Sequence, residues 1–517
     1  MSASNEENIQ RGPTDPKTAR EAQQRKAEKR SNTLYAAIAV VFVVFAAAAI
    51  VWRSNVIPRT VAAATVNGEK YNAAEVNFYY QNAYQNFVGN YSSMLSYIGL
   101  NTNAPLESQV ISEDTAAMTG LDAGMTWHDF FMDQALSQIA TVQATLDAAE
   151  AEGFVFSDSL QTQYNDSMEA LAQSAASNGL SVKEYLQTNL GSIMTEKIYG
   201  EQLMRMLKYS EYVDSVQDSM TYTDAELEAA YAESPESYDR VSYEVVTISG
   251  TAPSTTDADG KTVSPTEEEN AAAKEAAKKA ADEMVAAYRS GSKLETLAAG
   301  NENAKYYSYD DASYSGESVT EWLFDSARKA GDSVVLDNGG STYYVTVFHD
   351  RFREEYNTVN VRHILSAPET TTMSKDDAGY EDEVARLKAE ATAKAEDILA
   401  QWQSGEATEA SFAALALENS TDGGSKYNGG LYTQVYQGQM VPTFNDWCFD
   451  ASRKAGDTGV VETDYGTHVM YFVGKDLPRW QVLVSETLKN DDITTWFTGM
   501  STKYTAEKQD FGAKFVG

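Results

Sequence analysis

The chain has 517 residues, enough for about two to four domains, and its 40 Lys and Arg against 76 Asp and Glu give a formal net charge of −36. A surface this acidic excludes nucleic-acid binding, which needs a basic patch, and it disfavours tight adsorption to anionic lipid. The single cysteine, Cys448, excludes an intrachain disulfide and a thiolate metal cluster.

The N-terminal part contains a long apolar stretch. Residues 34–52 carry no charge over 19 positions, and as a helix they would span roughly 28 Å, close to the hydrocarbon thickness of a bilayer. Residues 1–33 hold seven Lys or Arg and five acids, a net charge of +2, which leaves −38 for the rest of the chain. Because positive flanks stay in the cytoplasm, we predict a single-pass transmembrane anchor with a cytoplasmic tail at 1–33 and an extracytoplasmic remainder at the cell membrane. The alternative is a cleavable signal peptide with its cleavage site near Ala62–Ala64.

The segment 62–238 is predicted to be an all-helical domain, because apolar residues recur in it at spacings of three and four. Residues 478–517 return to this helical pattern, and we expect this C-terminal segment to pack on the helical domain. The clearest helical stretches of the first segment are Asn72–Phe87, Trp127–Glu152, Ser159–Asn178, Ser181–Gln187 and Leu190–Ser219.

An internal repeat occupies the region between these two segments. Trp322–Asp332 matches Trp447–Asp457 at an offset of 125, and Ala281–Gly291 matches Ala395–Gly405 at an offset of 114. A strand-like run precedes each pair and a polar loop follows each run. We therefore predict two copies of one β-α-β unit, at 239–352 and 358–475.

The two copies differ in their polar residues. The second copy has eleven more residues between the matching segments, and these fall in Asn419–Met440, a range that includes Asp422 and the Gly429-Gly430 pair. At an offset of 125 the first copy has Tyr343 where the second has His468, and it has apolar or Thr residues around Val246 where the second has His363. The simplest interpretation is a duplication in which the first copy lost its polar residues, so the second copy is predicted to carry the chemistry.

The second copy resembles the parvulin family in five segments that keep the family's order and approximate spacing. These segments are Val361–Leu365, Ser420–Asp422, Gly429–Leu431, Gly438–Phe444 and Tyr465–His468. The combination of a helical region with parvulin-like domains also resembles the extracytoplasmic foldases PrsA and SurA, and Thr65–Lys70 is similar to the start of their N-terminal domain. The resemblance implies an α+β chain with an N-terminal transmembrane helix, a helical chaperone-like domain, two tandem parvulin-like domains of which the first is degenerate, and a C-terminal helix.

The resemblance also implies an activity. It predicts a peptidyl-prolyl cis–trans isomerase (rotamase) that acts without a cofactor on unfolded or partly folded exported polypeptides containing X–Pro bonds. The positions that match the family's catalytic residues are His363, Asp422 and His468. The positions that match its substrate-binding residues, or adjoin them, are Leu431, Met440, Phe444 and Thr463. One departure from the family is Leu-Tyr-Thr after Gly430, where many parvulins continue with Asp-Leu-Gly.

The chemistry of the reaction fits this set of residues. Isomerisation about X–Pro breaks no bond, so it needs neither a metal nor a nucleophile, only a pocket for the proline and an environment that favours the twisted amide. Met440 and Phe444 would supply the apolar pocket, and a polar cluster of the histidines with Asp422 would act electrostatically. Two alternatives remain open: a metal site of two histidines and a carboxylate, and a catalytically inactive anchored holdase whose parvulin copies serve as a scaffold.

Overall fold

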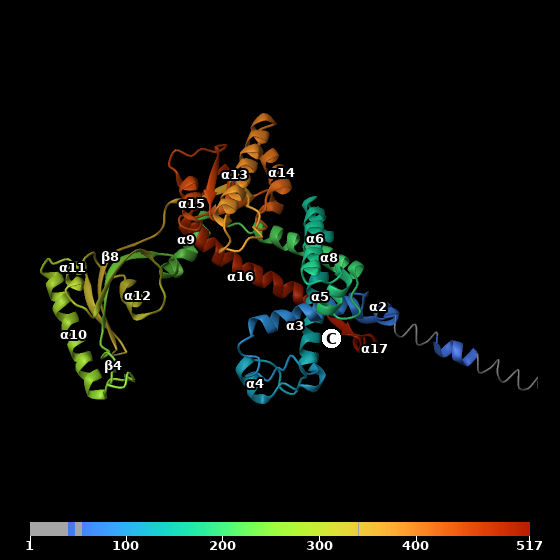
Figure 1. Cartoon of the computed structure of the whole chain (residues 1–517), viewed down its shortest axis with the longest axis horizontal. Helices are drawn as coiled ribbons and strands as arrows, with labels where there is room; N and C mark the ends of the chain where they lie inside the picture. Colours follow the sequence, from blue (N-terminus) through green and yellow to red (C-terminus); the bar gives the residue numbers. More distant parts are fainter. Residues whose placement is uncertain (1–39, 47–53, 340) are drawn as a thin grey trace, which may run out of the picture. The chain divides into compact units, whose positions relative to one another are not determined.

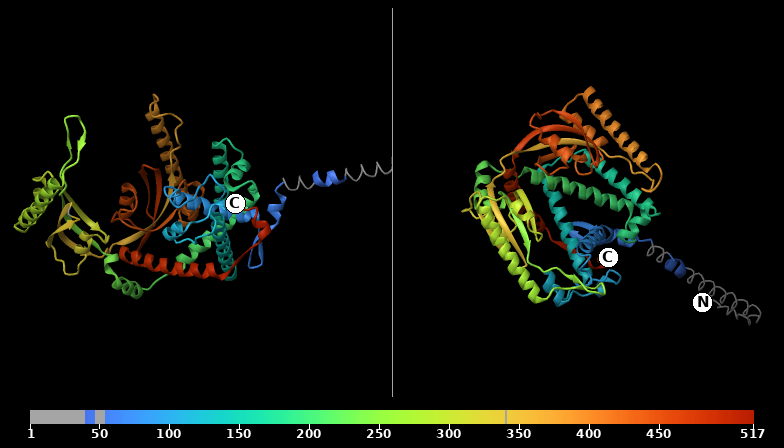
Figure 2. Two further views of the ribbon diagram at one scale, coloured as in Figure 1. Left: turned by 90° about the horizontal axis from the view of Figure 1, so that it is seen from below. Right: turned by 60° about the vertical axis from the view of Figure 1, so that its left-hand side comes forward.

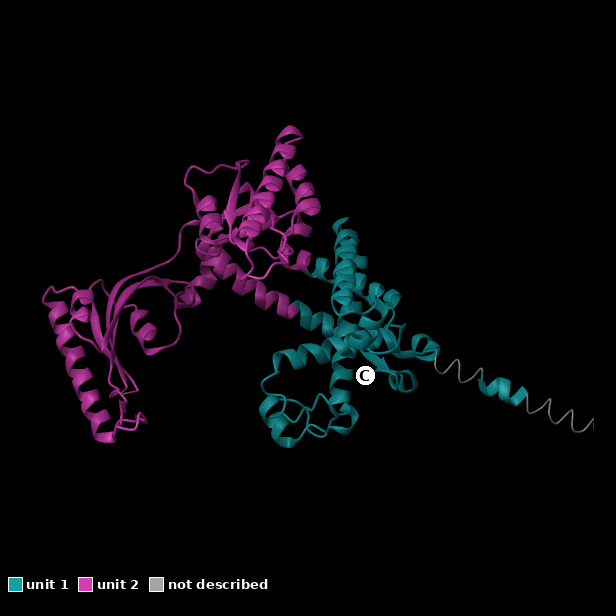
Figure 3. Ribbon diagram, viewed as in Figure 1, with its two compact units in different colours: residues 1–213, 496–517 teal, residues 214–495 magenta. Residues whose placement is uncertain are grey.

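The computed structural model describes residues 40–46, 54–339 and 341–517. The predicted anchor at 34–52 lies largely outside this set, which includes only its helical residues 40–46. Among the described residues, no helix is both long enough and apolar enough to cross a membrane. The chain mixes helix and sheet and divides into two compact units, residues 1–213 with 496–517 and residues 214–495 (Figure 1, Figure 3).

Unit 1 is mainly helical and is built around helix α5 (Trp127–Glu152). Thr126 caps this helix by accepting a hydrogen bond from the backbone N–H of Asp129, and Gly153 ends it with φ of 68°. Fully buried residues recur along one face of α5 at intervals of four, beginning with Trp127 and Phe131. The other helices described in this unit are α2 (Val56–Thr60), α3 (Ala73–Asn90), α4 (Glu113–Thr119), α6 (Ser159–Ser177), α7 (Val182–Leu190), α8 (Glu196–Ser219) and α17 (Asp510–Ala513).

The prediction of an all-helical domain at 62–238 was wrong in one respect, because unit 1 contains a three-stranded antiparallel sheet. Its strands are β1 (Ala62–Val66), β2 (Glu69–Asn72) and β13 (Ala506–Lys508), in the order β13-β1-β2. The turn between β1 and β2 is Asn67-Gly68, with φ of 48° and 82°, which is a strong hairpin signal in a sequence. Strand β13 comes from the C-terminal segment, which is therefore not wholly helical.

Unit 2 contains two four-stranded antiparallel sheets with the same topology. The first sheet has the order β6-β3-β8-β7 and the second has the order β10-β9-β12-β11. The first repeat consists of β3 (Arg240–Ser249), β4 (Thr255–Thr256), β5 (Thr262–Val263), α10 (Glu267–Arg289), α11 (Leu294–Ala299), β6 (Ala304–Ala312), α12 (Ser318–Leu323), β7 (Ser333–Asn338) and β8 (Thr342–Phe352).

The second repeat follows the same order of elements. It consists of β9 (Asn357–Ser366), α13 (Tyr380–Ser404), α14 (Glu409–Asn419), β10 (Leu431–Val435), α15 (Pro442–Phe449), β11 (Thr458–Thr463) and β12 (Gly466–Pro478). Helix α9 (Asp224–Glu233) precedes the two repeats, and α16 (Arg479–Lys503) follows them.

Each sheet of unit 2 is covered on both faces. In the second repeat α13 and α14 pack on one face around Ile364 and Phe412, and α15 packs on the other around Val361 and Phe444 (Figure 2). Because side chains alternate along a strand, Val359, Val361 and His363 of β9 point to the α15 face. That face is the one on which the predicted site residues gather.

Candidate active site

The two predicted histidines lie on neighbouring central strands of the second sheet. Strands β9 and β12 run antiparallel, and Met470 lies opposite His363. His468, two residues before Met470, therefore lies on the same face in the diagonal position. His363 and His468 are only 3% and 6% exposed, and their rings stack with centroids 5.2 Å apart.

A loop between α14 and β10 brings Asp422 to this histidine pair. The loop depends on Gly430, which has φ of 74° and whose carbonyl accepts a hydrogen bond from the N–H of His363 at 2.8 Å. A Cβ atom at this position would lie 2.2 Å from the carbonyl oxygen of His363. Only glycine allows this approach of the loop to β9, so the Gly429-Gly430 pair positions the carboxylate rather than merely ending a turn.

The polar side chains form one continuous hydrogen-bonded network. Asp422 Oδ2 lies 2.9 Å from His363 Nε2, and the Nδ1 atoms of His363 and His468 are 3.0 Å apart. Thr463 Oγ1 lies 2.9 Å from Nε2 of His468 and completes the chain of contacts. Two further hydroxyls, those of Ser425 and Tyr432, donate to Asp422 Oδ2.

This network fixes the tautomer of each ring. Because the Asp422 carboxylate only accepts, His363 Nε2 carries the proton and donates it. In its neutral form His363 presents an unprotonated Nδ1, to which His468 Nδ1–H donates, and His468 Nε2 then accepts from the Thr463 hydroxyl. Every donor in the row from Thr463 to Asp422 then points in one direction.

The surroundings shift three pKa values. The hydrogen bond from His363, followed by those from the hydroxyls of Ser425 and Tyr432, holds the pKa of Asp422 far below its usual range, despite the opposing effect of burial. Burial lowers the pKa of His468 from 6.5 to about 4, with a further contribution from the neighbouring His363. Burial, followed by the hydrogen bond to Asp422, raises the pKa of Tyr432 to about 12. At neutral pH the site therefore holds one carboxylate, a neutral His468 and a neutral phenol.

An apolar wall adjoins the network. Phe444 of α15 is 3% exposed and places its edge against both imidazoles, with centroid distances of 5.6 Å to His363 and 5.3 Å to His468. Met440, in the loop before α15, is partly buried against the same hydrophobic cluster. The wall is thus continuous with the core of the α15 face, and this core fixes its position.

One predicted residue, Leu431, does not face the site. Leu431 lies opposite Arg362 in the pairing of β10 with β9, so its side chain points to the face covered by α13 and α14. The next residue, Tyr432, lies opposite Val361, stacks on His363 at 5.2 Å between centroids and donates to Asp422. The assignment of Leu431 to the proline pocket is therefore corrected: the alternation along β10 places Tyr432 on the site's face.

Sequence reasoning missed both Tyr432 and Ser425. Tyr432 could have been found from strand alternation, since a strand that begins at Leu431 has to turn one of these two neighbours toward His363. Ser425 had no comparable signal, because its contact with Asp422 depends on the fold of a loop. Its backbone carbonyl accepts from the N–H of Gly430 at 2.8 Å, and this contact orients the loop.

The first repeat lacks the network, and its equivalent positions differ by one residue from those predicted. The backbone N–H of Phe348 in β8 donates to the carbonyl of Asp332, and the backbone N–H of Phe472 in β12 donates to the carbonyl of Asp457. Phe348 and Phe472 are therefore equivalent, and the offset between β8 and β12 is 124 and not 125. The position equivalent to His468 is therefore Tyr344. The pairing of β3 with β8 makes Val245, within the predicted apolar stretch around Val246, the equivalent of His363.

The geometry favours an electrostatic site rather than a nucleophilic one. Ser425 Oγ lies 2.9 Å from His363 Nε2, but this nitrogen donates to Asp422 and so cannot accept the serine proton. The Thr463 hydroxyl donates to His468 Nε2, but the other nitrogen of that ring meets His363 and not the carboxylate that orients the histidine of a triad. The facing Nδ1 atoms of His363 and His468 are engaged with each other. In the described ranges no group of three His, Cys, Asp or Glu side chains is placed to hold a metal ion.

Comparison with known proteins gives the same domain. Residues 347–475 match a family profile described as "PPIC-type PPIASE domain". A relative named "Foldase protein PrsA", from Caldanaerobacter subterraneus subsp. tengcongensis, is 33% identical over 158 residues, which cover 30% of this chain and 40% of the relative. "Foldase protein PrsA 1" from Listeria innocua serovar 6a is 37% identical over 86 residues, which cover 17% of this chain and 27% of the relative. The matched part thus spans less than half the length of either relative.

A solved structure of PrsA from Bacillus subtilis covers 77% of this chain and 93% of its own, at 13% identity and a TM-score of 0.28. Because that TM-score is low, we base the assignment on the domain match. The domain match at residues 347–475 confirms the parvulin resemblance indicated by the segments that contain His363 and His468, the Gly429-Gly430 pair, and Met440 with Phe444. The chain is similar to PrsA foldases in this region, and its second repeat is a PPIC-type peptidyl-prolyl isomerase domain of the parvulin family.

Proposed function

We propose that the chain is a peptidyl-prolyl cis–trans isomerase and folding chaperone for exported polypeptides, held at the membrane by residues 34–52 with its bulk on the extracytoplasmic side. The observation that carries the isomerase proposal is the buried network from Thr463 to Asp422 beside the wall formed by Phe444 and Met440. The similarity to PrsA foldases supports the choice of exported, incompletely folded chains as substrates.

The isomerisation neither breaks nor forms a covalent bond, so the protein has only to favour the twisted amide. The planar X–Pro amide owes its barrier of roughly 18–20 kcal/mol to resonance that places negative charge on oxygen. Phe444 and Met440 would hold the proline ring in apolar surroundings, which disfavour the charge-separated planar form. The ionised Asp422, whose side chain is 21% exposed, would act on the same charge, because a fixed anion near the carbonyl oxygen favours the twisted state. A thousandfold acceleration requires about 4 kcal/mol, within reach of a few preorganised contacts.

The histidines have a positioning role in this proposal. His363 holds the Asp422 carboxylate, and His468 fixes the tautomer of His363, so that neither has to transfer a proton during the reaction. Thr463 is the outermost residue of the row and fixes His468 in turn. Ser425 and Tyr432 hold the carboxylate from its other sides and keep it ionised.

A refolding experiment tests the proposal. The slow, proline-limited refolding phase of an unrelated protein should accelerate in proportion to the concentration of the full chain, and Asp422→Ala should abolish this acceleration while the far-UV circular dichroism spectrum stays intact. An Asp422→Ala variant as fast as the wild type would contradict the role of the carboxylate. Protease accessibility in intact cells, combined with carbonate extraction of membranes, tests the anchor and its orientation.

The second candidate function, a catalytically inactive holdase, is favoured by one observation. The first repeat keeps the complete sheet topology with Val245 and Tyr344 in place of the two histidines, so this fold persists without the site. If the holdase proposal holds, suppression of aggregation would be the same in the wild type and in Asp422→Ala, and neither protein would accelerate the slow refolding phase.

A further inference from the structure

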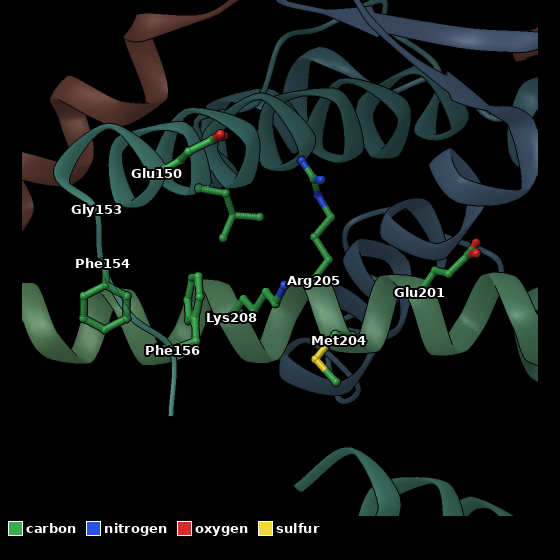
Figure 4. Close-up of a pocket in the computed structure, with 9 residues that line it drawn as sticks. Glu150, Gly153, Phe154, Phe156, Glu201, Met204, Arg205 and Lys208 are labelled. Carbon is green, nitrogen blue, oxygen red and sulfur yellow. The ribbon is translucent and has the colours of Figure 1, made fainter. Parts of the chain in front are cut away.

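Unit 1 contains a cavity that the isomerase mechanism does not use. It lies between the C-terminal half of α5, the segment Gly153–Phe156 and α8, and its volume is about 530 Å³. Cavities that bind small molecules or short segments fall in this size range. We call it the α5–α8 pocket; its lining residues are Leu146, Glu150, Gly153, Phe154, Phe156, Glu201, Met204, Arg205 and Lys208 (Figure 4).

The lining combines an apolar wall with two cations. Phe154 and Phe156 meet edge to face at 5.1 Å between centroids, because Gly153 ends α5 with φ of 68° and turns the chain back along α8. Both rings are half-buried, and Lys208 Nζ lies 5.4 Å from the centre of the Phe156 ring. Figure 4 shows Arg205 extending from α8 toward α5, with Lys208 one turn farther along the same helix.

The two cations have no carboxylate partner within 4 Å among the residues that the structure describes. Arg205 donates to two neutral groups, the hydroxyl of Tyr71 at 2.7 Å and the side-chain oxygen of Gln143, which fix its guanidinium in place. Lys208 places its ammonium over the Phe156 ring. Within the described residues, two cations without a close carboxylate therefore lie beside the half-buried rings of Phe154 and Phe156.

The two carboxylates of the lining do not neutralise this pair. Glu201 forms an exposed ion pair with Lys197 at 3.6 Å, and Figure 4 shows it at the end of the pocket away from Phe156. Glu150 is exposed on α5, across the pocket from α8, and among the described residues it forms no ion pair within 4 Å with either cation. A ligand carboxylate would therefore meet Arg205 and Lys208 directly, with Glu150 as an opposing charge on the rim.

We propose that the α5–α8 pocket binds a segment of an unfolded polypeptide in which an internal acidic residue adjoins a large apolar one. The apolar side chain would pack against Phe154, Phe156 and Leu146, and the carboxylate would pair with Arg205 and Lys208. This inference rests on the proposed chaperone function, and it names the site and the chemistry of the polypeptide segment that unit 1 recognises.

Peptide binding tests the inference. The probe is a fluorescent decapeptide without proline, acetylated and amidated at its ends, with an internal Phe-Glu pair; binding to the full chain is followed by anisotropy. Replacing Glu by Gln in the peptide, or Lys208→Glu in the protein, should weaken binding about five- to tenfold, as expected for loss or reversal of one partly exposed charge contact. Glu150→Gln should tighten binding, a change of sign that damage to the fold would not produce. The matched control is Lys183→Glu, an equal charge change at an exposed position of α7, which should leave binding unchanged.

Equal binding of the Glu and Gln peptides by the wild type, equal binding by Lys208→Glu and the wild type, or no binding at all would overturn the inference. Because the probe contains no proline, its binding does not depend on isomerisation. A wild-type chain that binds the probe but does not accelerate proline-limited refolding would overturn the isomerase proposal alone, and the reverse result would overturn this inference alone.

Discussion

The buried His468 makes the second repeat sensitive to mild acid. Burial lowers its pKa from 6.5 to about 4, so between these values the unfolded chain binds a proton that the folded chain does not. Folding stability therefore rises with pH across this window, and it is lost as the pH falls from 6.5 toward 4. The full shift corresponds to about 3 kcal/mol, and the loss by pH 5 is about 2 kcal/mol, a roughly 30-fold increase in the unfolded fraction.

The chain offers a specific probe of this loss. Its only cysteine, Cys448, is 1% exposed in the core of the α15 face, so its labelling by a disulfide reagent that works in mild acid reports the opening of the second repeat. We expect the labelling rate, corrected for the reactivity of the free thiol, to rise about 30-fold between pH 7.5 and pH 5. His468→Asn should remove most of this dependence. Since the chain has four histidines, nuclear magnetic resonance of labelled imidazoles can follow His468 directly.

The contribution of Asp422 falls in a different pH range and does not confuse this test. Its folded pKa is lowered, so the stability it provides is present above its usual pKa of 3.8 and is lost only below that value. A resonance of His468 that titrates near 6.5, or a labelling rate with the same pH dependence in the wild type and in His468→Asn, would refute the account of a neutral, buried His468.

Three further predictions concern the residues around the network. Gly430→Ala should destabilise the second repeat by about 3 kcal/mol, since its Cβ would meet the His363 carbonyl. The control Gly438→Ala, at a similar φ of 83° with open space around it, should cost about 1 kcal/mol. Urea-dependent labelling of Cys448 measures both free energies, and equal costs would contradict the close approach of Gly430 to β9. Tyr432→Phe should lower stability by about 1 kcal/mol and raise the pKa of Asp422, because one of three donors to Oδ2 is lost; carboxyl resonances report the pKa, and an unchanged value would show that the hydroxyl does not hold the carboxylate. Met440→Ala should raise the KM for an X–Pro peptide about tenfold with little change in the fold, and an unchanged KM would remove Met440 from the proline pocket.

The site could be predicted from the sequence as far as local patterns reach. The grouping of His363, Asp422 and His468 could be predicted because each lies in a short segment of distinctive composition. These segments also follow one another in the order that the parvulin family has. Tyr432 and Leu431 were confused because a shift of one residue along a strand exchanges its faces, and the sequence around the glycine pair does not say where β10 begins. The same kind of error displaced Tyr344 to Tyr343 in the first repeat.

The features that the sequence did not reveal depend on contacts between residues far apart in the chain. Strand β13 is three residues long and pairs with β1 through contacts such as Ala64 with Lys508, so no periodicity within the C-terminal segment could reveal it. The α5–α8 pocket depends in the same way on the packing of α8 against the end of α5, since Arg205 is held by Tyr71 and Gln143 from two other elements. Its basic and aromatic residues look like an ordinary amphipathic surface when they are read along the chain.

The rate of cis–trans exchange in a short X–Pro peptide, measured by magnetisation transfer with catalytic amounts of the full chain, tests the central claim most directly. We predict an acceleration that saturates with peptide concentration, that is lost in Asp422→Ala and that is retained in His349→Asn, a substitution of a half-exposed histidine of the first repeat. The absence of acceleration for every residue tried before proline, with the wild type folded, would contradict the claim that the second repeat is an isomerase.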